Sequence, residues 1–329
     1  MTRRLICLIL TVVMLSSLFV LNTSAAGASG VIYEQTFTRP DGAGTDWIPE
    51  GWNITGRHGG SDFSGGTYRV TEEEYVELCR GTYGGSSASG AAAMWYDCSS
   101  LGLPSKFTYM FDVNVQSTDG NETDIYSYMG VGGKLITMSY VDQTPGVWYR
   151  YCVQMDGNAA KVYRKKIIDA SGNAINEEYT IFKDVTNLGD RTNEFYIYSS
   201  GANSTVWVDN VKIMAGTALA SNSLSVTDTT ITADIKVQSV VVAPTSGASS
   251  TIAPILVVFD KKGKILDMVN SSSTLVFEAD NSGDKNHYTI TKDISAIRSK
   301  MQGGTVELYL WESIGSFNPL ADPYIYTVQ

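Results

Sequence analysis

The 329-residue chain carries 24 basic and 34 acidic residues, which gives a net charge of −10 at pH 7. A chain with this acidic balance is a poor partner for nucleic acid or for an anionic membrane surface. Glycine, serine, threonine, tyrosine and valine are abundant, and apolar stripes with a helical period are nearly absent. This composition favours an all-β protein.

The N-terminus predicts a signal peptide over residues 1–26. Two arginines precede an apolar run from Leu5 to Leu21, and small residues follow from Ser24 to Ala26. A basic start, an apolar middle and small residues at the cleavage position are typical of secreted proteins. A membrane anchor is the alternative, because the run is close to spanning length. After cleavage the mature chain would begin near Gly27, with a net charge of about −12.

Alternating apolar and polar residues predict strands through the first half of the mature chain. The clearest example is Lys106 to Val115, in which every second residue from Phe107 onward is apolar. This rhythm is typical of a half-buried antiparallel strand. Weaker patterns of the same kind predict strands at Val147 to Met155, Ala160 to Ile167 and Glu194 to Tyr198.

Val206 to Ile213 predicts a strand whose two-residue rhythm slips in the middle. Its first two valines and its last two apolar residues have opposite parity. One extra residue at Asp209-Asn210 would return all four to the same face, as a β-bulge does. This strand closes the first β-rich region, so we expect a domain boundary near residue 215.

A second β unit is predicted over residues 224–329, after a small and polar linker at residues 216–223. Turn signals at short intervals in this region are typical of an immunoglobulin-like sandwich. The predicted strands are Thr230 to Val242, a hairpin from Ile255 to Val269 with its turn at Asp260 to Lys264, His287 to Asp293, Thr305 to Trp311 and Tyr324 to Val328, and the predicted helical turn is Ile294 to Met301.

Three cysteines remain after cleavage of the signal peptide: Cys79, Cys98 and Cys152. An oxidising exterior permits one disulfide and leaves one thiol. The alternative is that all three are small buried apolar residues. Their spacing does not choose between these states, and no cysteine–histidine pattern indicates zinc.

The first domain, residues 27–215, carries four segments that resemble a known group of modules. These are Tyr33 to Phe37 leading to Pro49 to Trp52, then Trp95 to Asp97, Gly146 to Tyr149 and Val206 to Ile213. They resemble segments of the jelly-roll, concanavalin A-like and laminin-G-like domains of secreted bacterial proteins, which include carbohydrate-binding modules. The resemblance implies a jelly-roll β-sandwich.

The second domain is similar to C-terminal immunoglobulin-like modules of secreted Gram-positive proteins, many of them linked to polysaccharide metabolism. The residues that carry this likeness are Ile255 to Asp260, Gly263-Lys264, Leu310 to Ser313 and Pro319-Leu320. The expected fold is therefore all-β, with a jelly-roll β-sandwich followed by a smaller immunoglobulin-like β-sandwich.

A structural calcium ion is implied by the resemblance. In several of the resembling jelly rolls, an acidic residue of the first strand and the aspartate of the last strand hold calcium, and Glu34 and Asp209 fall at those positions. Calcium would need further oxygen ligands. The alternative is that Asp209 accepts hydrogen bonds from amides at the bulge, and the sequence leaves both open.

Catalysis is not expected. An enzyme of the laminarinase type carries the motif Glu-x-Asp-x-x-Glu on one strand, with two of its carboxylates as nucleophile and acid. Here Glu122 and Asp124 match the first two positions, but Ser127 stands at the third, so the general acid is missing. Neither His58 nor His287 lies in a pattern that suggests a lyase base. A glycosidase or polysaccharide lyase remains the alternative.

Carbohydrate binding requires aromatic rings for the apolar faces of sugars, with amides and carboxylates nearby for their hydroxyls. The candidate ligand-binding residues are Tyr126, Tyr128, Trp95, Tyr96, Asn121 and Asp124. Core packing is the alternative for each ring. Trp148 matches a position that is normally structural in the resembling modules, so it is left out.

We therefore expect a secreted, non-catalytic glycan-binding protein whose partner is a polysaccharide or cell-wall glycan. The second domain would act as a spacer or docking module. A cell-surface adhesion or structural protein is a further alternative.

Overall fold

The structure, a computed structural model, describes residues 31–55, 57–58, 61–62, 67–79, 92–117, 126–131, 134–139, 143–175, 177–188, 194–200, 204–241, 251–270, 275–276, 286–311, 320–321 and 323–329. The predicted signal peptide lies outside these residues, as do Glu122 and Asp124 of the acidic motif. No helix within them has the length and hydropathy needed to cross a bilayer.

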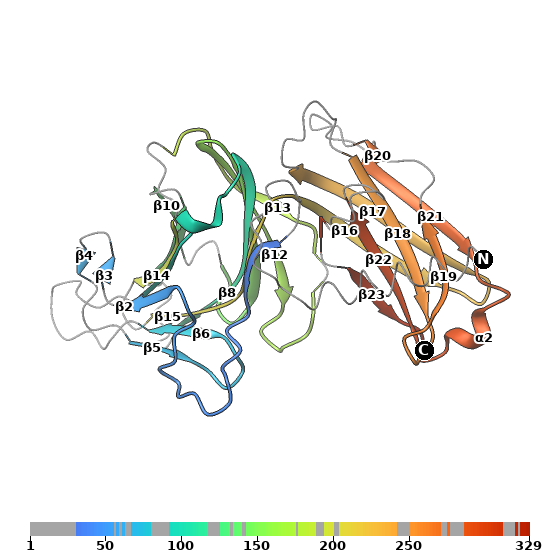
Figure 1. Ribbon diagram of the computed structural model, residues 1–329, viewed down its shortest axis with the longest axis horizontal. Helices are drawn as coiled ribbons and strands as arrows, with labels where there is room; N and C mark the ends of the chain where they lie inside the picture. The colour runs from blue at the N-terminus through green and yellow to red at the C-terminus, as the bar shows by residue number, and fades with distance from the viewer. Residues whose placement is uncertain are drawn as a thin grey trace.

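Two antiparallel sheets face each other in the N-terminal half of the chain (Figure 1). The strands of the larger sheet are β1 (Val31–Gln35), β5 (Thr67–Val70), β6 (Val76–Cys79), β8 (Lys106–Ser117), β11 (Trp148–Asp156), β12 (Ala159–Ile168), β13 (Thr180–Val185) and β15 (Ser204–Met214). Their order is β13-β12-β11-β8-β15-β6-β5, with β1 also paired to β15.

The smaller facing sheet has the order β10-β9-β14-β7-β2. Its strands are β2 (Trp52–Thr55), β7 (Ala92–Asp97), β9 (Tyr126–Val131), β10 (Lys134–Ser139) and β14 (Glu194–Ser200), and a separate hairpin joins β3 (Arg57–His58) to β4 (Ser61–Asp62). A short 3-10 helix, η1 (Ser99–Leu101), follows β7.

The core of this sandwich is built from the apolar residues whose alternation with polar residues predicts its strands. In β8, Phe107, Phe111 and Val113 are fully buried and belong to one apolar cluster, which also contains Phe195 of β14 and Val206 of β15. These side chains point inward because successive residues of a strand face opposite sides. The opposite side of the larger sheet, here called the outer face, is therefore left for the intervening residues.

The predicted bulge in β15 is confirmed. The register of β15 against β8 shifts between Asp209 and Lys212, and Asn210 has φ 52°. On its other edge, β15 pairs with β6 up to Val208 and with β1 from Val211 onward. The bulge thus lies where β15 changes partner, and an asparagine tolerates the left-handed backbone there better than most residues.

The C-terminal half forms a second pair of sheets around its own apolar cluster. The first sheet has the order β16 (Thr217–Val226), β17 (Thr230–Val241), β21 (His287–Asp293), and the second has the order β19 (Ile265–Asn270), β18 (Thr251–Phe259), β22 (Thr305–Trp311), β23 (Tyr324–Thr327), with β20 (Leu275–Val276) beside β18. The hairpin turn at residues 260–264 and a short helix, α2 (Arg298–Met301), agree with the predictions.

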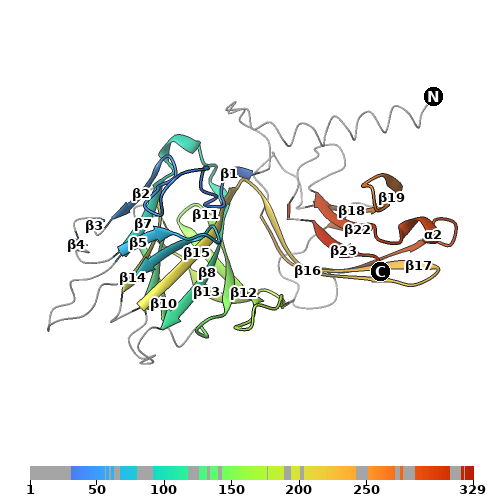
Figure 2. The ribbon, with the colours of Figure 1, turned by 90° about the horizontal axis from the view of Figure 1, so that it is seen from below.

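The predicted linker at residues 216–223 is instead mostly strand, because β16 begins at Thr217 and pairs along its length with β17. Leu219 and Leu224 of this strand are buried, in two different apolar clusters. Pairing with the next strand, β17, overrides the small, polar composition that suggested a flexible connection. Figure 2 shows β16 leading from the first sandwich directly into the second.

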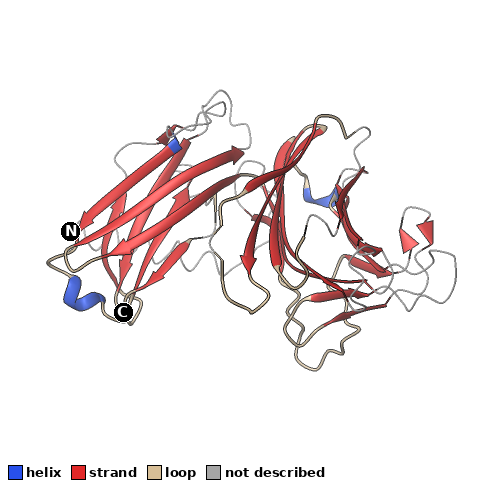
Figure 3. Cartoon of the chain, turned by 180° about the vertical axis from the view of Figure 1, so that it is seen from behind, coloured by secondary structure: helices blue, strands red, loops and turns tan. Residues whose placement is uncertain are grey.

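The predicted all-β fold is confirmed, with strand as the dominant structure of the described residues (Figure 3). The apolar cluster of the first sandwich ends at Ile213, and that of the second begins at Leu224, on either side of the expected boundary near residue 215. The immunoglobulin-like nature of the second sandwich stays a prediction.

Candidate functional site

The structure places Tyr96, a predicted sugar-binding ring, in a packing role. Its ring stacks on Tyr33 with the centroids 4.3 Å apart, and it lies 5.5 Å from the ring of Trp52. All three pack against the core of the first sandwich. Trp95 points to the opposite side of β7, where it is half-buried and in register with Tyr196 of β14.

Tyr126 and Tyr128, the other predicted rings, lie on β9. In register, Tyr128 stands opposite Tyr198 of β14 and Thr137 of β10. The side chains of both tyrosines lie outside the described part of the structure, as do Asn121 and Asp124 entirely. Their proposed role in binding therefore stays a prediction.

Three aromatic rings that the sequence analysis did not select meet on the outer face of the larger sheet. Tyr75 lies 4.8 Å from Trp207 and 5.7 Å from Trp148, and the two indoles are 6.2 Å apart, measured between ring centroids. All three side chains are half-buried. We call this group the aromatic platform.

Strand register explains how the platform forms. Trp207 on β15 and Trp148 on β11 both stand opposite Asn114 of β8, one from each side. Val206 and Val208 flank Trp207 in sequence and are fully buried in the core. The alternation of the strand therefore turns Trp207 away from the core, and the register brings Trp148 to the same face.

Residues that stand opposite one another on neighbouring strands form a row across the sheet, and the residues beside Trp207 in its row are polar. Glu77 of β6 stands opposite Trp207, and its Oε2 accepts a hydrogen bond of 3.0 Å from the indole Nε1. Arg69 of β5 is next in the row and pairs with Glu77, with 2.7 Å between Nε and Oε1. On the other side, Asn114 donates from Nδ2 to the carbonyl of Gly146 at 3.1 Å.

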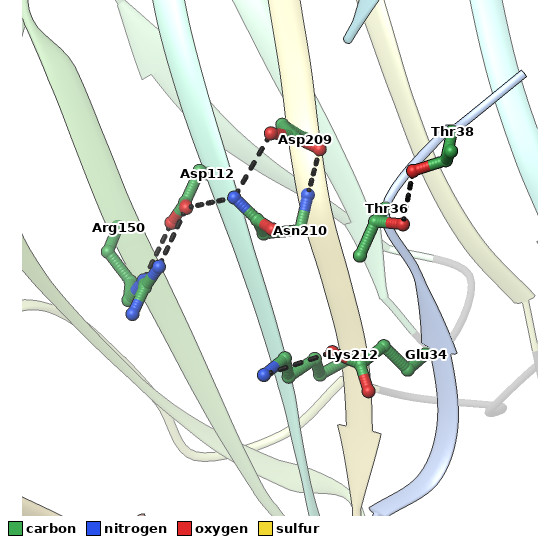
Figure 4. A network of polar contacts seen from close by, with 8 residues as sticks. All are labelled: Glu34, Thr36, Thr38, Asp112, Arg150, Asp209, Asn210 and Lys212. Atoms are coloured by element: carbon green, nitrogen blue, oxygen red, sulfur yellow. Dashed lines mark hydrogen bonds and ion pairs between the residues drawn. The ribbon is translucent and has the colours of Figure 1, made fainter. Parts of the chain in front are cut away.

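The neighbouring row of the outer face holds a buried ion pair. Asp112 of β8 is 2% exposed, and Arg150 of β11 binds it through two hydrogen bonds of 2.7 and 2.8 Å (Figure 4). Asn210 donates from Nδ2 to Asp112 at 3.0 Å and to Asp209 at 3.1 Å. A doubly hydrogen-bonded, nearly buried pair of this kind fixes β8, β11 and the bulge to one another.

Asp209 sits at the end of this row with an altered proton affinity. Burial raises the pKa of Asp209 to about 7, and the neighbouring carboxylates of Asp112 and Glu74 add to the effect. The hydrogen bond from the Asn210 amide to Asp209, 2.7 Å long, acts in the opposite direction. Near neutral pH, Asp209 is therefore poised between its protonated and ionised forms.

The residues present do not fit a calcium site built from Glu34 and Asp209. Glu34 binds Lys212 at 3.1 Å, in a pair that Figure 4 shows apart from the Asp209 network. Asp209 accepts hydrogen bonds from Asn210 on both oxygens. Within the described residues, no group of three or more acidic, cysteine or histidine side chains is arranged to hold a metal. The geometry matches the hydrogen-bonded alternative for Asp209.

The two described cysteine side chains are free thiols. Cys98 and Cys152 are both buried, in the core of the first sandwich and in a separate cluster on the outer face. They lie in different clusters and do not pair with each other. The side chain of Cys79 lies outside the described part.

No protein-family model matches the chain, and no curated protein matches it. Among solved structures, the exoplasmic domain of VIP36, in a Ca²⁺- and Man3GlcNAc-bound form, is 11% identical, with 51% of this chain and 85% of that chain covered and a TM-score of 0.32. Lectin II from Ulex europaeus is 9% identical, with coverage of 55% and 97% and a TM-score of 0.33.

An uncharacterised protein from Mycobacterium paratuberculosis gives similar values, with 10% identity, coverage of 55% and 99% and a TM-score of 0.34. At these TM-scores the likenesses carry no argument about ligands.

Proposed function

We propose that this chain is a secreted, non-catalytic glycan-binding protein that holds a polysaccharide against the aromatic platform of Tyr75, Trp148 and Trp207. The observation that carries the proposal is that these three rings contact one another outside the core, on one face of a sheet. Secretion rests on the predicted signal peptide.

The surroundings of the platform suit a sugar. Aromatic rings pack against the C–H faces of pyranose rings, and polar groups at their edge bind the hydroxyls. Glu77 and Arg69 supply a carboxylate and a guanidinium beside Trp207, and the Arg69 side chain is 58% exposed. Hydrogen bonding of the indole to Glu77 also fixes the orientation of the Trp207 ring before a ligand arrives.

Glycosidase activity is the second candidate, because two carboxyl groups in different environments lie beside the platform. A glycosidase needs an acid and a base or nucleophile that both reach the scissile bond. Asp209 has the raised pKa of an acid, but Asp112 is 2% exposed and is bound on both oxygens by Arg150. Asp112 is therefore a structural ion-pair partner, and the geometry favours binding without catalysis.

A panel of plant and microbial polysaccharides tests the proposal, with affinity electrophoresis and calorimetry as the measurements. We expect Trp207→Ala and Trp148→Ala each to weaken binding by about tenfold or more, because hot-spot aromatics dominate such contacts. Trp207→Phe should cost less than Trp207→Ala, since it keeps one aromatic ring while it loses the second ring of the indole and the hydrogen bond to Glu77.

Trp95→Ala is the matched control, since it removes the same side chain from the other sheet. If binding is lost only in Trp95→Ala, Tyr126→Ala or Tyr128→Ala, the ligand lies on the smaller sheet and the platform proposal is wrong. Release of reducing ends or unsaturated products would contradict the non-catalytic proposal. Retention on cells or on a partner protein without polysaccharide binding would favour adhesion.

A further inference from the structure

A cavity of about 180 Å³ lies where the second sandwich meets the outer face of the first. One water molecule needs roughly 10–15 Å³ by the same measure, so the space is large enough for a small organic molecule. Arg150, Lys165 and Tyr179 line it from the first sandwich, and Leu219, Asn222 and Tyr324 line it from the second.

Direct hydrogen bonds hold the two sides of this junction together. The side-chain amide of Gln238 on β17 accepts from the backbone N–H of Tyr179 at 3.1 Å and donates to its carbonyl at 2.6 Å. Ser239 donates to Gln154 of β11 at 2.7 Å, and both side chains are buried. The walls of the cavity are therefore fixed from both sandwiches.

Two cations face each other at the cavity. Arg150 on β11 and Lys165 on β12 stand directly opposite in register, an arrangement that is unfavourable for like charges. The charge of Arg150 is compensated by Asp112. Within the described residues Lys165 makes no ion pair, and its ammonium lies 4.7 Å from the centroid of the Tyr179 ring. Burial and the nearby Arg150 lower the pKa of Lys165.

We propose that this cavity binds a small monocarboxylate, whose negative group meets Lys165 and whose remaining atoms pack against the apolar wall formed by Met110, Met214 and Leu219. The site is separate from the aromatic platform, and the proposal stands independently of glycan binding.

The chemistry of the walls selects the ligand class. Because Asp112 already neutralises Arg150, the cavity offers one uncompensated positive charge, which suits a monoanion better than a dianion such as phosphate. The apolar wall suits a ligand with a hydrocarbon part or the C–H face of a sugar. A uronate and an aromatic carboxylate both meet these conditions, and they share the carboxylate that Lys165 would bind.

Titration of the protein with sodium glucuronate, sodium benzoate, glucose and inorganic phosphate, followed by calorimetry and saturation-transfer NMR, tests the proposal. We expect at least one carboxylate to bind and Lys165→Gln to weaken it by about tenfold or more, as expected for loss of a charged hydrogen-bond partner. Binding of glucuronate alone would identify an acidic saccharide, and binding of benzoate alone an apolar acid.

Lys161→Gln is the matched control, because Lys161 lies on the same strand, is exposed and does not line the cavity. Lys161→Gln should leave the affinity for the carboxylate unchanged within about twofold. Trp207→Ala should do the same, which would show that the carboxylate does not bind at the aromatic platform. Asn222→Asp provides a second variant, since it places a fixed carboxylate in the cavity and should exclude the ligand. The proposal fails if neither carboxylate binds at millimolar concentration, or if Lys165→Gln and Asn222→Asp both retain wild-type affinity.

Discussion

Asp112 and Asp209 are held by the same donor, because the side-chain Nδ2 of Asn210 lies 3.0 Å from one carboxylate and 3.1 Å from the other. The two aspartates differ in what else surrounds them. Arg150 pairs directly with Asp112 and only partly offsets the effect of burial on Asp209, whose pKa burial raises to about 7. Asp209, which lies at the bulge, is therefore harder to ionise than an ordinary carboxyl group.

Asp209→Asn should change the pH dependence of stability. The folded pKa of Asp209, about 7, lies above its unfolded value of roughly 3.9. The stability that this group contributes is therefore complete below about pH 4 and is lost as the pH rises through 7. We expect the free energy of unfolding of the variant, relative to wild type, to increase from pH 4 to pH 8 by on the order of 1–2 kcal/mol after solvent screening.

Urea denaturation at several pH values measures this difference. Asp169→Asn is a control of opposite sign, because hydrogen bonds from Asn173 lower the pKa of that exposed carboxyl. A pH-independent difference for Asp209→Asn would contradict the prediction. A fall in melting temperature on adding a chelator, absent in Asp209→Ala, would instead place a bound cation at the bulge.

Substitutions of Asn210 test whether the backbone at the bulge is left-handed. Asn210→Ala and Asn210→Gly both remove the amide that bridges the two aspartates, but only alanine is strained at φ 52°. We expect both variants to be destabilised by about 1–3 kcal/mol. The alanine variant should be less stable than the glycine variant by a further ~1 kcal/mol in urea denaturation. Equal stability of the two variants would contradict a left-handed residue at this position.

Substitution of Gly51 tests whether packing holds the Tyr96 ring in place. A Cβ at Gly51, which has φ +79°, would lie 2.8 Å from Cε2 of the Tyr96 ring. Gly51→Ala should therefore cost about 2–3 kcal/mol, from backbone strain and from overpacking. Gly42→Ala is the control, because Gly42 has φ +82° but no atom within 4 Å of the added Cβ, and it should cost only ~1 kcal/mol. Similar costs would mean that the Tyr96 ring moves freely.

Cys98 and Cys152 should resist alkylation in the folded protein. Burial raises the pKa of Cys98 to about 11 and also raises the pKa of Cys152, so the reactive thiolate is scarce. At pH 8 we expect both to react with iodoacetamide at least about a hundredfold more slowly than in urea. Mass spectrometry of the alkylated peptides measures each site. A disulfide between Cys98 and Cys79 would contradict the free thiol.

Local alternation made much of the fold predictable. The strand expected at Lys106 to Val115 is β8, and the slipped rhythm at Asp209-Asn210 is a bulge, because both depend on which face neighbouring residues occupy. The linker expected at residues 216–223 is instead mostly strand, because β16 is stabilised by pairing with β17, a contact that the local composition does not reveal.

The candidate site depends on contacts that are remote in sequence. Tyr75, Trp148 and Trp207 meet because β6, β15, β8 and β11 are neighbours in the larger sheet, and strand order is not encoded in any local pattern. The alternation around Trp207 was sufficient to indicate an outward-facing ring. Trp148, which family resemblance suggested to be structural, also faces outward, and only the sheet order joins the two.

The short connection between the two sandwiches determines how a pulling force would pass from one to the other. Only Ala215 and Gly216, both buried, separate the end of β15 from the start of β16. A force applied to the C-terminal sandwich would therefore meet no flexible linker between β15 and β16 that could extend first. The force would pass directly into β15, the strand that carries Trp207, and so into the proposed glycan-binding face.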